Sequence, residues 1–107
     1  MPYIVTTGWY PTHIEKEITE KYFEVVKQFP FDRSLGKDTI PVAITTNKNG
    51  VKMFSVMEVK EGKLEDALTW CSKRMLLLQS IKGWEYKVRV WVTIVEALEL
   101  SGISSPG

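Results

Sequence analysis

The chain has 107 residues, of which 44% are hydrophobic and 25% are charged, a composition typical of one ordinary globular domain. Fourteen basic residues against thirteen acidic ones leave a formal charge of +1, so the charge balance gives no reason to expect binding to nucleic acid or to an anionic membrane. We therefore expect a single domain over residues 1–107, with neither nucleic acid nor membrane as a partner.

The chain holds one cysteine, Cys71, and one histidine, His13. One cysteine makes no internal disulfide, and one histidine without a second ligand beside it makes no convincing metal site, so we expect no metal and no cofactor. The N-terminal stretch MPYIVTTG lacks the charged and apolar regions of a signal peptide, which favours a cytoplasmic location by elimination. Few asparagines and glutamines, beside plentiful Glu, Lys, Val and Ile, favour a thermophilic source.

The first elements along the chain are a predicted strand and a predicted helix. Residues 3–10, YIVTTGWY, are rich in β-branched and aromatic residues and end at Pro11, which cannot donate a ladder hydrogen bond. Thr12 and Glu15 have the spacing of a capping box. Apolar residues then recur every three or four positions, which predicts a helix to about Phe29.

A hairpin is predicted in the middle of the chain. Residues 31–39 have the composition of a surface connection, and residues 40–46 and 51–60 have that of strands. The NKNG stretch at 47–50 supplies residues that favour a tight turn. These two strands should therefore pair with each other.

The last third of the chain predicts a second helix, a fourth strand and a short terminal helix. An apolar stripe that includes Cys71 runs through residues 63–81, and WEYKVRVWV at 84–92 alternates between apolar and polar residues. A second capping-box pattern, Thr93 with Glu96, predicts a terminal helix through about residue 100. Residues 101–107, SGISSPG, are expected to form a tail.

The element order is β-α-β-β-α-β followed by a short C-terminal helix, which predicts an α+β fold of the ferredoxin-like type. In that fold an antiparallel sheet carries both helices on one face, so the opposite face must be polar or must meet a partner. Alternation along 84–92 predicts Tyr86, Val88, Val90 and Val92 beneath the helices. The residues expected on the bare face are Lys87, Arg89 and Trp91 from that strand and Lys52, Phe54, Val56, Glu58 and Lys60 from residues 51–60. In residues 3–10, neither alternating set is plainly the core set.

This pattern resembles the small ferredoxin-like proteins that form dimeric α/β barrels. The resemblance covers nearly all of residues 3–100 and is one of element order, element lengths and a half-bare sheet. The wording YIVTTGWYPTH…SLGKDTIPVAI…VMEVKEGKLEDAL also looks like small uncharacterised prokaryotic proteins of that kind. The resemblance implies a homodimer, open to higher assembly, in which two sheets enclose a cavity. It implies no activity, because none is attached to that group. Some other dimeric barrels are monooxygenases, heme-handling proteins or isomerases, but none of their catalytic residues matches a position here.

Five residues are candidates for binding a small aromatic or anionic molecule between the sheets: Trp9, Tyr10, Phe54, Arg89 and Trp91. The aromatic side chains offer flat apolar walls, and the guanidinium can bind a carboxylate. Each also has a structural interpretation. The aromatic side chains can cover the core or the edge of the dimer interface, and Arg89 can form an ion pair within the sheet or between subunits.

Two residues are weak candidates for a general base, His13 and Glu58. Cys71 falls in the apolar stripe of its helix and is expected to be an inert buried thiol. The sequence therefore favours a homodimeric binding or interaction module. Two alternatives stay open: a cofactor-independent enzyme of monooxygenase or isomerase type that uses His13 or Glu58, and a purely structural assembly protein. RNA binding is not expected, because VKMFSVME supplies one Phe and ends in an acidic residue.

Overall fold

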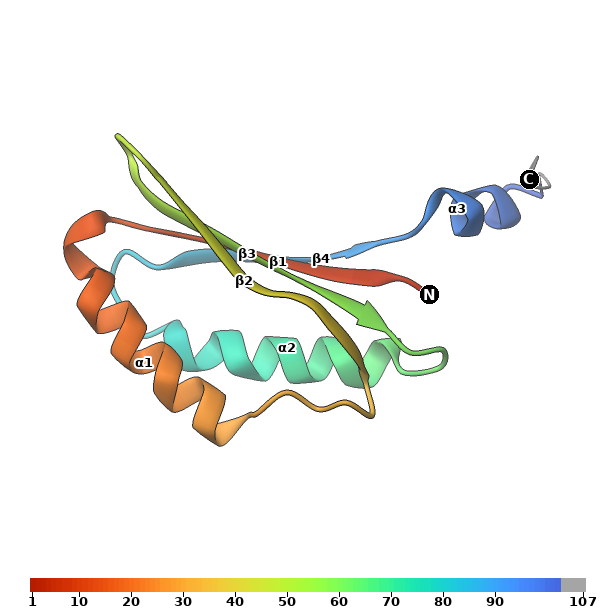
Figure 1. Cartoon of the computed structure of the whole chain (residues 1–107), viewed down its shortest axis with the longest axis horizontal. Helices are drawn as coiled ribbons and strands as arrows, with labels where there is room; N and C mark the ends of the chain where they lie inside the picture. Colours follow the sequence, from red (N-terminus) through yellow and green to blue (C-terminus); the bar gives the residue numbers. More distant parts are fainter. Residues whose placement is uncertain (103–107) are drawn as a thin grey trace.

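A computed structural model of the chain describes residues 1–102 (Figure 1). It contains a four-stranded sheet, three α-helices and a short 3-10 helix. In chain order the elements are β1 (Tyr3–Tyr10), η1 (Thr12–Ile14), α1 (Glu15–Gln28), β2 (Gly36–Asn47), β3 (Gly50–Val59), α2 (Leu64–Leu78), β4 (Glu85–Trp91) and α3 (Ile94–Leu100). The predicted α+β class, with a short C-terminal helix, is confirmed. Residues 103–107 of the expected tail lie outside the described residues.

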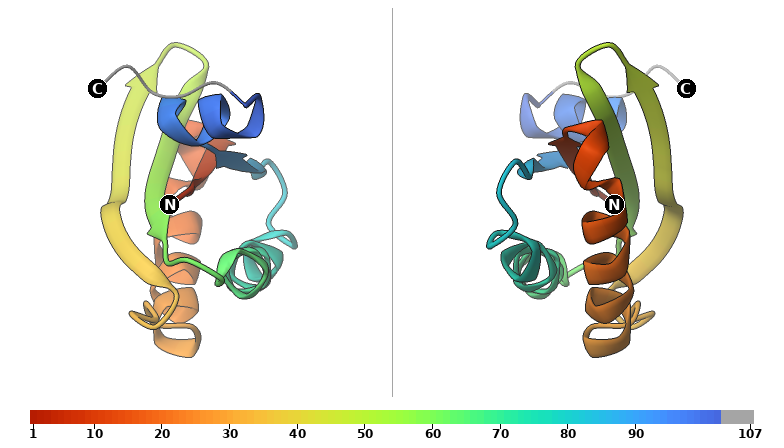
Figure 2. Two further views of the ribbon diagram at one scale, coloured as in Figure 1. Left: turned by 90° about the vertical axis from the view of Figure 1, so that its right-hand side faces the viewer. Right: turned by 90° about the vertical axis from the view of Figure 1, so that its left-hand side faces the viewer.

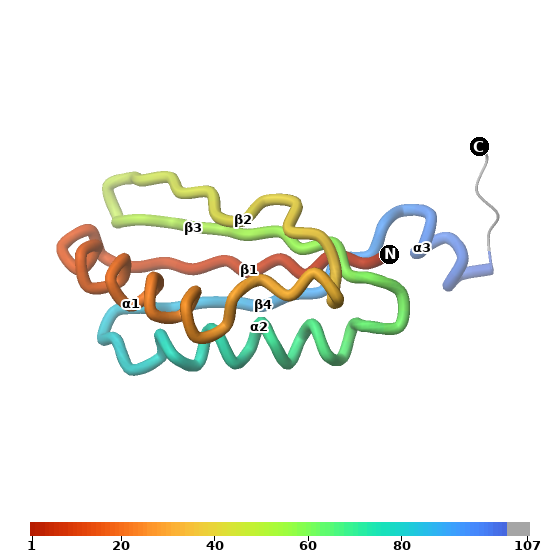
Figure 3. The backbone as a smooth tube through the Cα atoms, turned by 60° about the horizontal axis from the view of Figure 1, so that its bottom comes forward, coloured from red at the N-terminus to blue at the C-terminus, as the bar shows by residue number. Residues whose placement is uncertain are grey.

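The sheet has the strand order β2-β3-β1-β4, and every neighbouring pair is antiparallel (Figure 3). Helices α1 and α2 lie together on one face of this sheet (Figures 1 and 2). Helix α3 follows β4 and lies beyond the end of the sheet, on the side away from α1 and α2. Among residues 1–102, no helix covers the other face, which we call the open face.

The register of β1, which the sequence left undecided, places a mixed set of residues beneath the helices. Ile4, Thr6, Gly8 and Tyr10 are all buried there. Gly8 is required because the Trp84 ring lies directly over it, so that a Cβ at this position would be 2.2 Å from Cη2 of that ring. A threonine and a glycine in the core set explain why hydrophobic alternation could not identify this face.

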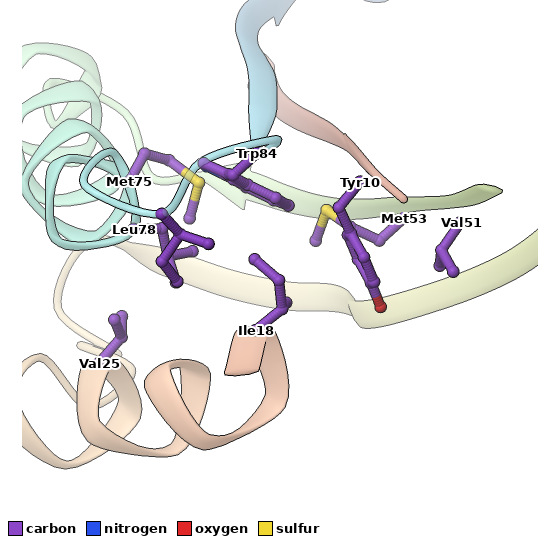
Figure 4. Close-up of a cluster of buried hydrophobic side chains, with 9 residues drawn as sticks. Tyr10, Ile18, Val25, Val51, Met53, Met75, Leu78 and Trp84 are labelled. Carbon is purple, nitrogen blue, oxygen red and sulfur yellow. The ribbon is translucent and has the colours of Figure 1, made fainter. Parts of the chain in front are cut away.

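The core between the sheet and the helices consists of two clusters of buried side chains. One joins β1, β3, α1 and α2 around Trp84 (Figure 4). The other lies around Leu35, Met57 and Val59 and contains Cys71. Burial raises the pKa of the Cys71 thiol to about 11, so the thiol stays protonated near neutral pH. This agrees with the inert buried thiol that was expected.

The start of the first helix differs from the prediction. Residues Thr12–Ile14 form the 3-10 helix η1, and its N-cap residue, Pro11, has an extended backbone. Helix α1 begins only at Glu15. Because Thr12 lies inside this turn, its side chain does not cap a helix. The predicted capping box of Thr12 and Glu15 is therefore wrong.

Strand β2 begins earlier than predicted, inside the stretch that was expected to be a surface connection. Leu35 is buried and its carbonyl accepts a hydrogen bond from the Lys60 amide at 2.9 Å, which brings Gly36 into register with Val59. A Cβ at Gly36 would be 2.0 Å from the Glu58 carbonyl oxygen, so only glycine allows this close approach. The core thus extends the strand beyond what local composition indicates.

The end of β4 also differs from the prediction. Val90 and Val92 were expected beneath the helices, but both are exposed. β4 ends at Trp91, so Val92 lies beyond the strand and Val90 lies next to its last residue. Within residues 1–102, every helix falls short of the length and apolar character that crossing a membrane requires.

Candidate functional site

The open face is built from the outward side chains of the strands, arranged in rows by the register. Along β1 these are Tyr3, Val5, Thr7 and Trp9; beside them lie Trp91, Arg89, Lys87 and Glu85 of β4 and Glu58, Val56, Phe54 and Lys52 of β3. Four of the five predicted ligand-binding residues lie on this face: Trp9, Phe54, Arg89 and Trp91. The alternation of β3 and β4 in the sequence placed Phe54, Arg89 and Trp91 on this face correctly, because both strands are regular. The face of Trp9, which lies on β1, was left undecided by the sequence.

Tyr10, the fifth predicted ligand-binding residue, lies on the opposite side of the sheet. It is buried in the core, with its ring centroid 6.1 Å from that of Trp84. Burial, together with the nearby Glu15 carboxylate, raises the pKa of the Tyr10 hydroxyl, which therefore stays neutral. Tyr10 does not share a site with the other four residues.

Trp9 lies near two positively charged side chains on the open face. It lies between Lys52 on β3 and Lys87 on β4, whose ammonium nitrogens are 5.8 and 5.6 Å from the centroid of the indole ring. Both distances are in the range of cation–π attraction. The arrangement combines a flat aromatic surface with two positive charges, one on each side.

Arg89 and the two other aromatic residues occupy the rest of the open face. Arg89 lies opposite Val5, between Lys87 and Trp91 along its own strand, and makes no ion pair within residues 1–102. Trp91 is 60% exposed and Phe54 is 37% exposed. A free guanidinium beside a broad aromatic surface is suited to a carboxylate or to a partner's acidic side chain.

The charges of β3 and β4 on this face have a positive excess of one. Lys52, Lys87 and Arg89 outnumber Glu58 and Glu85. Two copies of this face brought together would gather positive charge between them. That charge favours an anion between the copies, or ion pairs such as Arg89 with Glu58 of the second copy.

The two candidate bases lie at opposite ends of the sheet. Glu58 pairs with Tyr3 at the start of β1, whereas His13 is exposed in η1, just beyond the end of that strand. Since β1 has eight residues, about 25 Å of strand separates the two ends. His13 and Glu58 therefore cannot act together on one small substrate. Nowhere in the described part of the chain do three or more His, Cys, Asp or Glu residues gather as a metal site would need.

Sequence reasoning did not identify one polar cluster on the helix side of the sheet. Asp38 of β2 and Arg74 of α2 meet beside Cys71 around a small cavity of about 30 Å³. Burial raises the pKa of Asp38, and the Arg74 charge partly opposes this rise. The cavity has room for a water molecule rather than an organic ligand. No local pattern signals this cluster, because its members come together only through the packing of α2 on β2.

Comparison with known proteins identifies no family for the chain. No protein-family model and no curated protein matches it. Among solved structures it is similar to the de novo designed protein Foldit4, with 14% sequence identity and a TM-score of 0.45 over 87% of this chain and 99% of that chain. A likeness at this level assigns neither family nor function.

Proposed function

We propose that the protein is a homodimer of ferredoxin-like subunits whose open faces pack against each other, and that a small anionic aromatic molecule binds between them. The element order and the strand order β2-β3-β1-β4 support the ferredoxin-like assignment. The partner is a second copy of the chain, and the ligand occupies the region around Trp9.

The apolar surface of the open face supports pairing with a second copy. Covering Trp91, of which 60% is exposed, would contribute about 3 kcal/mol if the whole side chain offers about 200 Å². Four strands joined by ladders of seven to nine paired residues outline roughly 500 Å², and corrugation raises their accessible area. Stable interfaces bury about 800 Å² per partner, so the open face supplies a large part of a dimer interface.

Helix α3 adds further apolar surface next to the open face. Ile94 is 73% exposed and Leu100 is 83% exposed. Within residues 1–102, the polar contacts that tie the start of this helix are its own capping box and an ion pair at 3.4 Å between the N-terminal amine and Glu96. A seven-residue helix is too short to be stable by itself in water, so packing on a second copy would explain its apolar composition.

The residues around Trp9 support the proposal that an anionic aromatic molecule binds between the open faces. An aromatic anion can stack on the indole while its charge lies near the ammonium groups of Lys52 and Lys87. Arg89 lies two residues from Lys87 on the same face and offers a guanidinium for a carboxylate. These groups define the ligand class as a small, flat, negatively charged molecule.

A titration with 2-naphthoate, followed by the NMR signals of the tryptophan indole N–H groups, tests this ligand class. We expect 2-naphthoate to shift the Trp9 signal, and we expect Lys87→Ala to weaken binding about three- to tenfold because it removes one of the two charges beside the ring. Lys27→Ala, which removes an exposed charge from the last turn of α1, is the matched control and should bind like the parent protein.

The titration also distinguishes a ligand-binding dimer from a purely structural one. Absence of binding in the millimolar range, or an equal loss in both lysine variants, would contradict a ligand site at Trp9. A dimer that does not bind 2-naphthoate would instead support a purely structural assembly role.

A further inference from the structure

The β2–β3 hairpin and helix α3 both extend beyond the sheet on its open side. Figures 1 and 2 show the hairpin tip and α3 away from α1 and α2. The hairpin turn lies beside Tyr10, the last residue of β1. Helix α3 follows Trp91, which pairs with Tyr3 at the start of β1. The hairpin tip and α3 therefore project from opposite ends of the sheet.

These two projections carry opposite charges. In the hairpin, over residues 43–54, the charged residues are Lys48 and Lys52, whereas in α3 they are Glu96 and Glu99. Glu96 forms an ion pair with the N-terminal amine at 3.4 Å. Glu99 and Lys48 are both exposed, and neither forms an ion pair within residues 1–102. These two charges can therefore pair with groups of a second copy.

Both projections also offer apolar surface. In the hairpin, Ala43 pairs with Phe54, which belongs to the open face and is partly exposed. In α3, Ile94, Val95 and Leu100 are exposed. A contact between α3 and a hairpin would therefore combine burial of apolar surface with a pair of opposite charges.

Two open faces can pair about a two-fold axis in two ways. If the axis runs along the strands, each α3 meets α3 of the second copy and the two hairpins meet each other, so like charges face each other. If the axis runs across the strands, opposite ends of the two sheets lie together, and each α3 meets the hairpin of the second copy. Because like charges repel and opposite charges attract, charge favours the second arrangement.

The second arrangement also adds interface area that the open face alone lacks. The face outlines roughly 500 Å², whereas stable interfaces bury about 800 Å² per partner. A seven-residue helix is about 10 Å long and about 10 Å wide, so covering one side of α3 adds on the order of 100 Å². The hairpin of the same copy, covered by the other α3, adds a similar area.

We propose that α3 of each copy docks on the β2–β3 hairpin of the other copy, with Glu99 beside Lys48 of the second copy and the apolar side chains of α3 near its Phe54. This inference rests on the proposed pairing of the open faces and specifies the symmetry of the dimer.

The same symmetry specifies how the charged side chains of the two open faces meet. Glu58, at one end of β3, comes near Lys52 at the other end of β3 in the second copy. Lys87 and Arg89 of both copies come together near the axis, since they flank the middle of β1. Arg89 lies far from Glu58 of the second copy in this arrangement, so its charge stays available for the anion.

Disulfide crosslinking of two variants of the full chain distinguishes the two arrangements. The chain's own thiol, Cys71, is buried, so introduced surface thiols react first. After mild oxidation, a mixture of Glu99→Cys and Lys48→Cys chains should give crosslinked dimers, whereas each variant alone should stay uncrosslinked. A mixture of Glu99→Cys with Lys27→Cys, on the exposed last turn of α1, is the control. Electrophoresis without reductant should show at least about tenfold more crosslinked dimer in the first mixture, since paired chains hold the thiols at a millimolar local concentration.

Charge reversal tests the ion pair itself. Because each dimer contains this contact twice, Glu99→Lys and Lys48→Glu should each raise the dissociation constant of the dimer about five- to twentyfold. The double variant, which exchanges the two charges, should recover the affinity of the parent chain. Glu20→Lys makes the same change of charge at an exposed position of α1 and should leave the dissociation constant unchanged. Sedimentation velocity measures all four.

Three results would overturn the docking of α3 while leaving a dimer in place. These are crosslinking of Glu99→Cys or Lys48→Cys alone as strong as in their mixture, a dimeric mixture that crosslinks no more than the control, and a double charge reversal that associates as weakly as the single ones. A parent chain that stays monomeric would instead contradict the pairing of open faces, and the docking of α3 with it.

Discussion

Gly8 shows how a single residue determines the packing of side chains on the helix side of the sheet. Glycine in a strand interior is usually unfavourable, since it adds conformational entropy to the unfolded chain and packs no side chain. Here its missing Cβ is the space that the Trp84 ring fills. The same glycine thereby positions the Trp84 ring in the core.

Gly8→Ala should lower the free energy of unfolding by about 1–3 kcal/mol, because the new methyl group would overlap the Trp84 ring. Urea denaturation of the parent and the variant measures this difference. In a Trp84→Phe background the smaller ring leaves room, so the same substitution should cost less. Equal costs in the two backgrounds would show that Gly8 and Trp84 do not interact as the structure places them.

Local sequence could not reveal these residue-level contacts. Trp84, Tyr10 and Gly8 look unrelated in sequence, and they meet only through the β1–β4 register and the turn after α2. Alternation assigned the faces of β3 and β4 because both strands mix charged and apolar residues regularly. It could not assign the faces of β1, where Thr6 and Gly8 occupy core positions.

At the scale of elements, α3 shows how a local sequence pattern sets the residue at which a helix begins. The capping box is present as predicted: the Glu96 amide donates to Thr93 Oγ1 at 3.1 Å, and the Thr93 amide donates to Glu96 Oε1 at 3.0 Å. These bonds and the nearby N-terminal amine lower the pKa of Glu96. The similar pattern at Thr12 fails because the preceding Pro11 leads into a 3-10 turn instead.

Thr93→Ala should destabilise α3 by about 1 kcal/mol and leave the sheet unaffected, because it removes the first-turn acceptor. Amide hydrogen exchange would then be about fivefold faster over Ala97–Leu100, with no change in β1. Ser72→Ala, at an exposed position of α2, provides the control. Unchanged exchange in α3 would mean that the capping box does not limit its opening.

The molecule as a whole is thin and has two layers, the sheet and the helices α1 and α2. Within residues 1–102, no third layer covers the open face. The extents of the molecule are 49 × 32 × 18 Å, and the thin direction leaves little depth for a core on both faces of the sheet. Helices bury one face, while Trp91, Phe54 and the apolar side chains of α3 remain exposed. The sequence predicted this asymmetry from the element order, but it could not predict that the β2–β3 hairpin and α3 extend to the open side, which depends on the twist of the sheet and on the turn after β4.

Truncating the exposed aromatics should therefore weaken association. Trp91→Ala should raise the dissociation constant of the dimer at least about a hundredfold, because each copy loses about 3 kcal/mol of buried apolar surface. Phe54→Ala should have a smaller effect, and His13→Ala, in the exposed turn after β1, should have none. Sedimentation velocity of the three variants measures these differences. Equal association in all three would exclude the open face as the interface.

The most direct test of a paired open face is the molar mass of the parent chain in dilute solution. Sedimentation equilibrium at low micromolar concentration should give twice the 12.3 kDa of one chain. A mass of one chain throughout the micromolar range would contradict the central claim that a second copy covers the open face.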